Sequence, residues 1–159
     1  MAQNDMIKEI RNVGYPKLPI NENRRPKDAT KEIDAHGKYV MPGIIDLHVH
    51  TGGKPKAPEA EYVYKLWLGH GITTVRGVPD GPLEWSLNEK ARSAKNQITA
   101  PRIVSFQRPG SGQEWRGRRI NTPQDAREWV QYANKKGVDG LKLGAYRPEI
   151  MSALISEAN

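Results

Sequence analysis

The chain has 159 residues, 36% hydrophobic and 27% charged, with a formal net charge of +7, a composition that fits a folded globular protein rather than a generally disordered one. No apolar run approaches the roughly 20 residues that span a bilayer, and the opening residues do not form a signal peptide, so we expect no membrane segment and, by default, a cytoplasmic location. The absence of cysteine excludes disulfides, thiolate metal sites and cysteine nucleophiles, which leaves histidine, carboxylate, carbonyl or modified lysine as metal ligands.

The N-terminal segment, residues 1–43, is expected to be rich in loops. Most of it is dominated by Asn, Pro, Lys and Arg, and only residues 6–10 have an amphipathic pattern. Its last part, residues 33–43, predicts a β-hairpin in which two short strands flank a turn at His36. We treat this segment as separate from residues 44–159.

Residues 44–159 alternate short β-prone runs with longer segments of helical period, which indicates successive βα units around a parallel sheet. The predicted strands are 44–50, 72–78, 102–106 and 138–143. The predicted helices are 59–69, 82–94, 122–137 and 148–158. A complete eight-fold β/α barrel takes roughly 250 residues, so the length permits only part of one. We predict an α/β fold, a partial TIM (β/α)8 barrel of about the first four βα units.

The helix predicted over 122–137 has the clearest boundaries. Thr122 supplies an N-cap, Pro123 takes the first helical position, Asp125 places a carboxylate in the first turn, and Gly137 ends the helix. One buried stripe is expected between these ends, formed by Ala126, Trp129, Val130 and Ala133.

Two histidines lie at the end of the first predicted barrel strand, in the run Asp46-Leu47-His48-Val49-His50. Side chains two apart on a strand point to the same face, so both imidazoles and Asp46 are expected on one side. Two imidazoles so placed can bind one metal ion, although strand histidines bonded to backbone groups would have the same spacing. We expect Asp46 to orient a histidine, and the alternative is that it satisfies backbone donors at the strand end.

The segment 37–50, which reads GKYVMPGIIDLHVH, resembles the motif that opens the barrel of the amidohydrolase superfamily almost residue for residue. Residues 71–76, GITTVR, resemble the second strand of that family, and 137–143, GVDGLKL, resemble its fourth strand with the bridging lysine at Lys142. The nearest branch is that of the imidazolonepropionases and the Xaa-Pro or Arg/Lys dipeptidases.

This resemblance implies a metal-dependent hydrolase that cleaves a C–N bond of an amide, cyclic amide or dipeptide by metal-activated hydroxide. It implies that His48 and His50 bind metal and that Lys142, in carbamylated form, bridges two divalent ions, with zinc the expected metal. It also implies that the segment 1–43 is a remnant of the small β-sandwich domain that precedes the barrel in the family.

The residue pattern around Lys142 is compatible with that role. Strand alternation places Val138, Gly140 and Lys142 on one face, so the lysine is expected inside the barrel, where desolvation favours its neutral amine. A neutral amine can react with carbon dioxide to give a carbamate, an anionic ligand with two oxygens. The alternative is a lysine whose ammonium group reaches solvent.

The chain also departs from the family pattern. Gly77 stands where the second-strand motif commonly has an aspartate after the arginine. The remaining metal histidines of the family come from the fifth and sixth strands and its catalytic aspartate from the eighth. We therefore expect this chain to be an N-terminal fragment that is inactive by itself.

Other interpretations remain open at this point. A non-catalytic half-barrel would need a partner, either a second copy or a complementing chain, to cover its sheet edge and apolar helices. A basic nucleic-acid-binding domain would use Arg116, Arg118 and Arg119, although short basic runs are usually solvated loops.

Two weaker candidates complete the sequence analysis. The loop 107–119 is either a mobile cover over the site or a solvated loop. His70 is expected to be the polar end of a helix.

Overall fold

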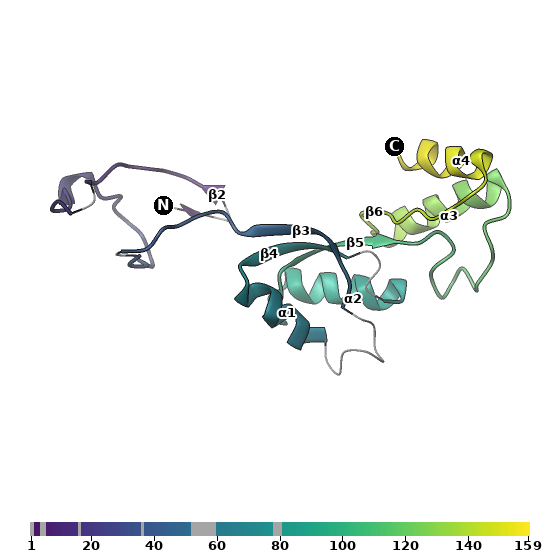
Figure 1. The fold of residues 1–159 in the computed structure, drawn as a ribbon, viewed down its shortest axis with the longest axis horizontal. Helices are drawn as coiled ribbons and strands as arrows, with labels where there is room; N and C mark the ends of the chain where they lie inside the picture. The colour runs from purple at the N-terminus through teal and green to yellow at the C-terminus, as the bar shows by residue number, and fades with distance from the viewer. Residues whose placement is uncertain (1, 4–5, 16, 36, 52–59, 78–80) are drawn as a thin grey trace. The chain divides into compact units, whose positions relative to one another are not determined.

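The computed structural model describes residues 2–3, 6–15, 17–35, 37–51, 60–77 and 81–159. They belong to two compact units, Met1–Met41 and Pro42–Asn159, whose elements are drawn in Figure 1. Within the described residues, no helix combines the length and the apolar character needed to cross a membrane.

The first unit contains little regular structure. Strands β1 (Ala2–Gln3) and β2 (Met6–Ile7) pair antiparallel, and η1 (Glu22–Arg24) is a single 3-10 turn. The hairpin predicted for 33–43 differs from the structure, which has a turn there and no strand among the described residues. Tyr39 and its two neighbours are exposed, and an isolated two-stranded hairpin without a face to pack against is marginal. His36 lies outside the described residues.

The second unit is built on a four-stranded sheet of order β3-β4-β5-β6 in which all neighbouring pairs are parallel. The strands are β3 (Ile44–Val49), β4 (Ile72–Gly77), β5 (Arg102–Gln107) and β6 (Gly140–Leu141). β6 is shorter than expected, but the backbone N–H groups of Asp139 and Lys142 donate to Ser105 and Gln107 carbonyls on either side of it, at 2.9 and 2.8 Å. The predicted parallel half-barrel sheet is confirmed.

One helix follows each strand, as the βα pattern predicted. The helices are α1 (Ala60–Gly69), α2 (Leu83–Ala94), α3 (Pro123–Lys136) and α4 (Pro148–Ala158). α1 packs against β4, α2 against β5, and α3 against α4. Figure 1 shows α1 and α2 on the same side of the sheet, so the opposite side of β3, β4 and β5 is the one that faces the interior of a barrel.

Helix α3 has the ends that its sequence predicted. The Thr122 hydroxyl accepts from the Asp125 N–H at 3.1 Å, and the Asp125 carboxylate accepts from the Thr122 N–H at 3.0 Å, which completes a capping box. Gly137 ends the helix in the left-handed region with φ of 88°, a conformation that costs glycine no Cβ clash.

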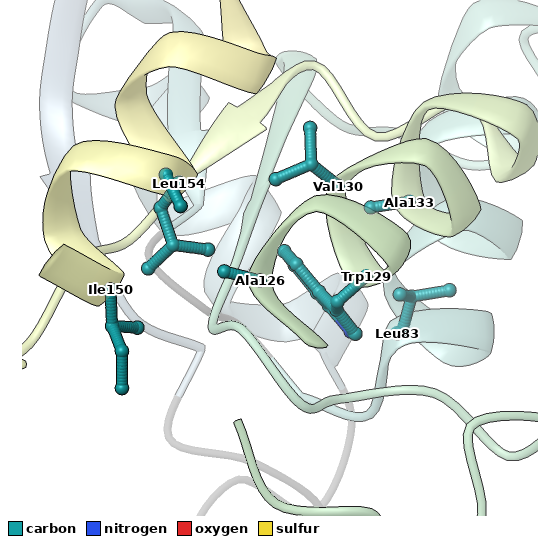
Figure 2. Packing of buried hydrophobic residues seen from close by; sticks show 8 residues of the cluster. Leu83, Ala126, Trp129, Val130, Ala133, Ile150 and Leu154 are labelled. Atoms are coloured by element: carbon teal, nitrogen blue, oxygen red, sulfur yellow. The ribbon is translucent and has the colours of Figure 1, made fainter. Parts of the chain in front are cut away.

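The unit has two apolar clusters. The larger one joins α2, α3 and α4 and contains the predicted stripe of α3 with Trp129 fully buried (Figure 2). Its members are Leu83, Ala126, Trp129, Val130, Ala133, Ile150, Ala153 and Leu154. The smaller cluster lies under the sheet, where Tyr64 of α1 packs with Val49, Val75 and Ile103 of three successive strands. Because Val49 packs against α1 in this cluster, its side chain marks the face of β3 that the helices cover. Residues 48 and 50 then point to the opposite face.

Candidate metal centre

The predicted site residues lie at the carboxyl ends of the strands. His48 is near the end of β3 and His50 follows it, whereas Lys142 follows β6 directly. Because the strands are parallel, these ends share one edge of the sheet, which is where barrel enzymes carry their catalytic groups. Both histidines are exposed and Lys142 is half-buried.

The two imidazoles converge. The Nε2 atoms of His48 and His50 are 3.2 Å apart, with ring centroids at 5.1 Å. At this separation the two Nε2 atoms can share one hydrogen bond, in which one ring is the donor and the other the acceptor. Only one of the two Nε2 atoms then carries a proton. Val49, between them, is buried on the helix side, as the alternation predicts, whereas Leu47, which the alternation puts on the same side, is 60% exposed.

Positive charge surrounds His48. The Lys142 ammonium is the largest cause that lowers the pKa of His48 below its usual value, followed by desolvation, by His50 and by Arg76, while the Asp46 carboxylate opposes them. The structure therefore brings His48, His50 and Lys142 into one electrostatic neighbourhood. The lowered pKa of His48 favours its neutral ring, the form that binds metal.

The histidine pair has a geometry that suits a metal. Two nitrogens that each lie about 2.0–2.1 Å from a tetrahedral zinc ion are about 3.3 Å apart, close to the 3.2 Å between the two Nε2 atoms. In the described part of the chain there is no group of three or more His, Cys, Asp or Glu residues that could complete a site. The donor set is thus a half-site of two imidazoles next to a lysine.

Asp46 contacts backbone rather than an imidazole. Its Oδ1 accepts from the N–H of His48 at 3.0 Å, so of the two roles considered from the sequence the backbone one is observed. The carboxylate nevertheless acts on the segment that carries the histidine pair.

Arg76 is a functional candidate that the sequence reasoning missed. Its Nε donates to the Leu47 carbonyl at 2.6 Å, and its guanidinium lies over the Phe106 ring at 4.8 Å from the centroid. The available signal was the alternation of β4, which puts Thr74 and Arg76 on the opposite face from buried Val75.

The loop 107–119 is packed against the helices. The Gln113 N–H donates to Glu84 of α2 at 2.6 Å, and the Trp129 indole of α3 donates to the Ser111 carbonyl at 2.9 Å. These bonds tie the loop to the helices rather than leaving it as a cover for the site.

The weaker candidates have local partners. The Arg118 guanidinium bonds both Asp125 and Glu128, so its charge is balanced and only Arg116 and Arg119 of that basic run lack an ion pair in the described structure. The His70 ring contacts the Leu66 carbonyl at 2.7 Å, as expected for a polar helix end.

Sequence comparisons find similarity to adenine deaminases, whereas no protein-family profile matches the chain. The Methanoculleus marisnigri adenine deaminase is 52% identical over 50 residues, which cover 31% of this chain and 9% of that protein. The Lactiplantibacillus plantarum adenine deaminase is 33% identical over 67 residues, which cover 42% and 12%. The chain thus matches about a tenth of the length of these relatives.

Structural comparisons find solved proteins described as a prolidase and an amidohydrolase. A Bifidobacterium longum protein described as a prolidase superposes with a TM-score of 0.57 at 25% identity, over 81% of this chain and 37% of its own. A crystal structure described as an amidohydrolase superposes with a TM-score of 0.64 at 18% identity, over 87% of this chain and 45% of its own. The second likeness concerns the fold alone, and both cover less than half of the neighbour.

Proposed function

Because the chain has the sequence and the fold of an amidohydrolase-superfamily segment, we propose that it supplies the first part of a metal-dependent site that hydrolyses C–N bonds. The observation that carries this proposal is the 3.2 Å approach of the His48 and His50 Nε2 atoms at the carboxyl edge of a parallel sheet. That separation is close to the roughly 3.3 Å between two nitrogen ligands of a single tetrahedral zinc ion.

In this proposal His48 and His50 would hold a divalent metal, with zinc the expected ion, and Lys142, as a carbamate, would be the bridging ligand that the family resemblance implies. In its ammonium form Lys142 would repel a metal cation bound at His48. The same repulsion is the largest cause that lowers the pKa of His48. Loss of a proton from the ammonium and addition of the neutral amine to carbon dioxide, with loss of a second proton, would replace that positive charge with the negative charge of a carbamate. A metal held there would supply activated water for attack on a polarised carbon.

The substrate class is proposed from chemistry shared by the relatives. Adenine deaminases act, as their name states, on a C–N bond of adenine, and the motif-based expectation is an amide, cyclic amide or dipeptide. All of these have a carbon bonded to nitrogen that water can attack. The described residues supply two imidazoles and one lysine, so a working centre takes further ligands and a proton-transfer group from outside this set.

Metal stoichiometry of the purified chain tests the proposal. Elemental analysis is expected to find zinc retained by the wild type and lost from the His48→Ala/His50→Ala double variant. His70→Ala is the matched control, because His70 bonds only a helix carbonyl in the described structure, and it should retain the metal. Equal zinc in the wild type and the double variant would refute the assignment of the two ligands.

Activity is a separate question. We expect the isolated chain to be inactive toward dipeptides, cyclic amides and adenine, since the half-site lacks the groups named above. Hydrolysis of any of these that disappears in His48→Ala would contradict this expectation while supporting the metal site.

One observation favours a second, non-catalytic role as a half-barrel that needs a partner. The edge strand β3 exposes Ile44, Ile45 and Leu47 at 50%, 60% and 60%, and exposed apolar residues at an open edge invite pairing with another strand. A partner would be a second copy or a complementing chain. Sedimentation that finds a monomer across the micromolar range would count against this role.

A further inference from the structure

The strand that carries the histidine pair is irregular where the pair begins. β3 and β4 pair Asp46 with Val75 and Val49 with Gly77, and the register shifts between them. Three steps along β3 thus correspond to two along β4, so one extra residue of β3 is accommodated at Leu47 and His48. Such a bulge takes backbone groups out of the ladder and redirects the side chains around it.

Two side chains bond the backbone at this irregular point. The His48 N–H donates to Asp46 Oδ1 at 3.0 Å. The Leu47 carbonyl accepts from Arg76 Nε at 2.6 Å, across 29 residues of sequence. One peptide unit, the one that joins Leu47 to His48, is therefore held at both its carbonyl and its N–H by charged side chains, whose hydrogen bonds are stronger than neutral ones.

Residues from the next two strands hold Arg76 in place. Its guanidinium lies over the Phe106 ring of β5, which limits the directions in which the donors can point. That ring in turn occupies the space above Gly140 of β6, where a Cβ atom would come within 2.9 Å of Phe106 Cδ1 and closer still to two other ring atoms. All four strands thus contribute to the position of one peptide unit.

We propose that Asp46 and Arg76 clamp the Leu47–His48 peptide unit and thereby set the direction in which His48 meets His50, so that Arg76 is a positioning residue for the metal half-site. The inference rests on the proposed metal site for its purpose, but the clamp itself is a property of the chain without metal. Arg76 touches no reacting group in this role.

Charge and geometry make opposite predictions for Arg76→Gln, which makes metal affinity a decisive readout. If Arg76 acted only through its charge, its removal would strengthen cation binding, because that charge opposes a cation at His48. If it clamps the peptide, its removal weakens binding by about ten- to a hundredfold, the usual effect of losing a group that orients a ligand. Calorimetric titration with Zn²⁺ separates the two, and Arg102→Gln, an exposed arginine on the neighbouring strand β5, is the matched control.

Hydrogen exchange of the His48 amide tests the clamp without metal. Exchange is expected to accelerate by about tenfold in Arg76→Gln and in Asp46→Ala, because each loses one bond of the held peptide unit. Asp46→Asn keeps an acceptor oxygen and should retain the protection, as should Arg102→Gln. Tryptophan fluorescence confirms that each variant is folded before it is compared.

The outcomes distinguish the two proposals. A wild-type chain that binds no zinc but loses His48 protection in both clamp variants would refute the metal site and support the clamp. Zinc binding by the wild type with unchanged or stronger affinity in Arg76→Gln, and unchanged exchange, would refute the clamp and leave the metal site standing.

Discussion

The substitution Gly140→Ala tests the packing that connects β6 to the candidate metal centre. Gly140 has no left-handed backbone requirement, so alanine meets no local strain there. Its Cβ would, however, lie 2.5 Å from Phe106 Cζ and 2.9 Å from Cδ1, whereas carbon atoms in ordinary contact are about 3.5–4.0 Å apart. The ring therefore has to withdraw by about 1 Å.

The size of the effect follows from two opposing contributions. Overpacking of this kind costs about 1–3 kcal/mol, and the Phe106 ring is only half-buried, which favours the lower part of that range. Replacing glycine restricts the unfolded chain and offsets about 0.4–1 kcal/mol. We expect a net loss of about 1 kcal/mol in the free energy of unfolding, together with faster exchange of the His48 amide, because displacement of the Phe106 ring disturbs its contact with Arg76.

Urea unfolding followed by tryptophan fluorescence measures this loss. The four tryptophans all lie in the unit Pro42–Asn159, so the signal reports that unit only. Gly69→Ala is the matched control, because nothing lies within 4 Å of a Cβ at that last residue of α1. It should stabilise by up to about 1 kcal/mol through helix propensity.

Two results would refute the reasoning. A change in stability of the same amount and sign in Gly140→Ala and Gly69→Ala would mean that the Phe106 ring does not occupy the space above Gly140. An equal destabilisation by Gly140→Ala in a Phe106→Ala background and in the wild type would also refute it, because removal of the ring removes the clash.

Three further predictions concern helices α3 and α4. Thr122→Ala removes the N-cap of α3 and should cost about 1 kcal/mol in urea unfolding, whereas Thr99→Ala, at an exposed loop position, should be close to neutral. Hydrogen bonds, the largest from the Thr122 hydroxyl, lower the pKa of Asp125. The contribution of Asp125 to the free energy of unfolding is therefore present above its unfolded pKa and is lost as pH falls through its folded pKa. In Asp125→Asn the loss of stability in acid should accordingly be less steep. Leu154→Ala, at a fully buried position, should lower the free energy of unfolding by about 2–5 kcal/mol. The adjacent Ile155→Ala, at a residue that is 46% exposed, should lower it by well under half as much in the same urea unfolding experiment.

Part of the candidate site was predictable from the sequence because it depends on neighbours along the chain. The alternation of a strand put His48 and His50 on one face, and the parallel βα pattern put Lys142 at the same sheet edge. The sequence favoured Asp46 as a residue that orients a histidine ring, whereas its carboxylate bonds the backbone N–H of His48, because its distance from the ring and from the backbone depends on how the strand bends. The assignment of all three residues to metal binding stays a prediction.

What the sequence by itself determined is the local structure: the cap and the left-handed end of α3, the apolar stripe that buries Trp129, and the alternation of strands with helices. Each of these depends on residues within a few positions of one another, so propensity and periodicity suffice. Only the tertiary structure decided the bulge at Leu47, the bond to Arg76 across 29 residues and the packing of Phe106 over Gly140. These depend on the register between strands and on the space left between side chains, which are set when the sheet assembles and not by any one segment.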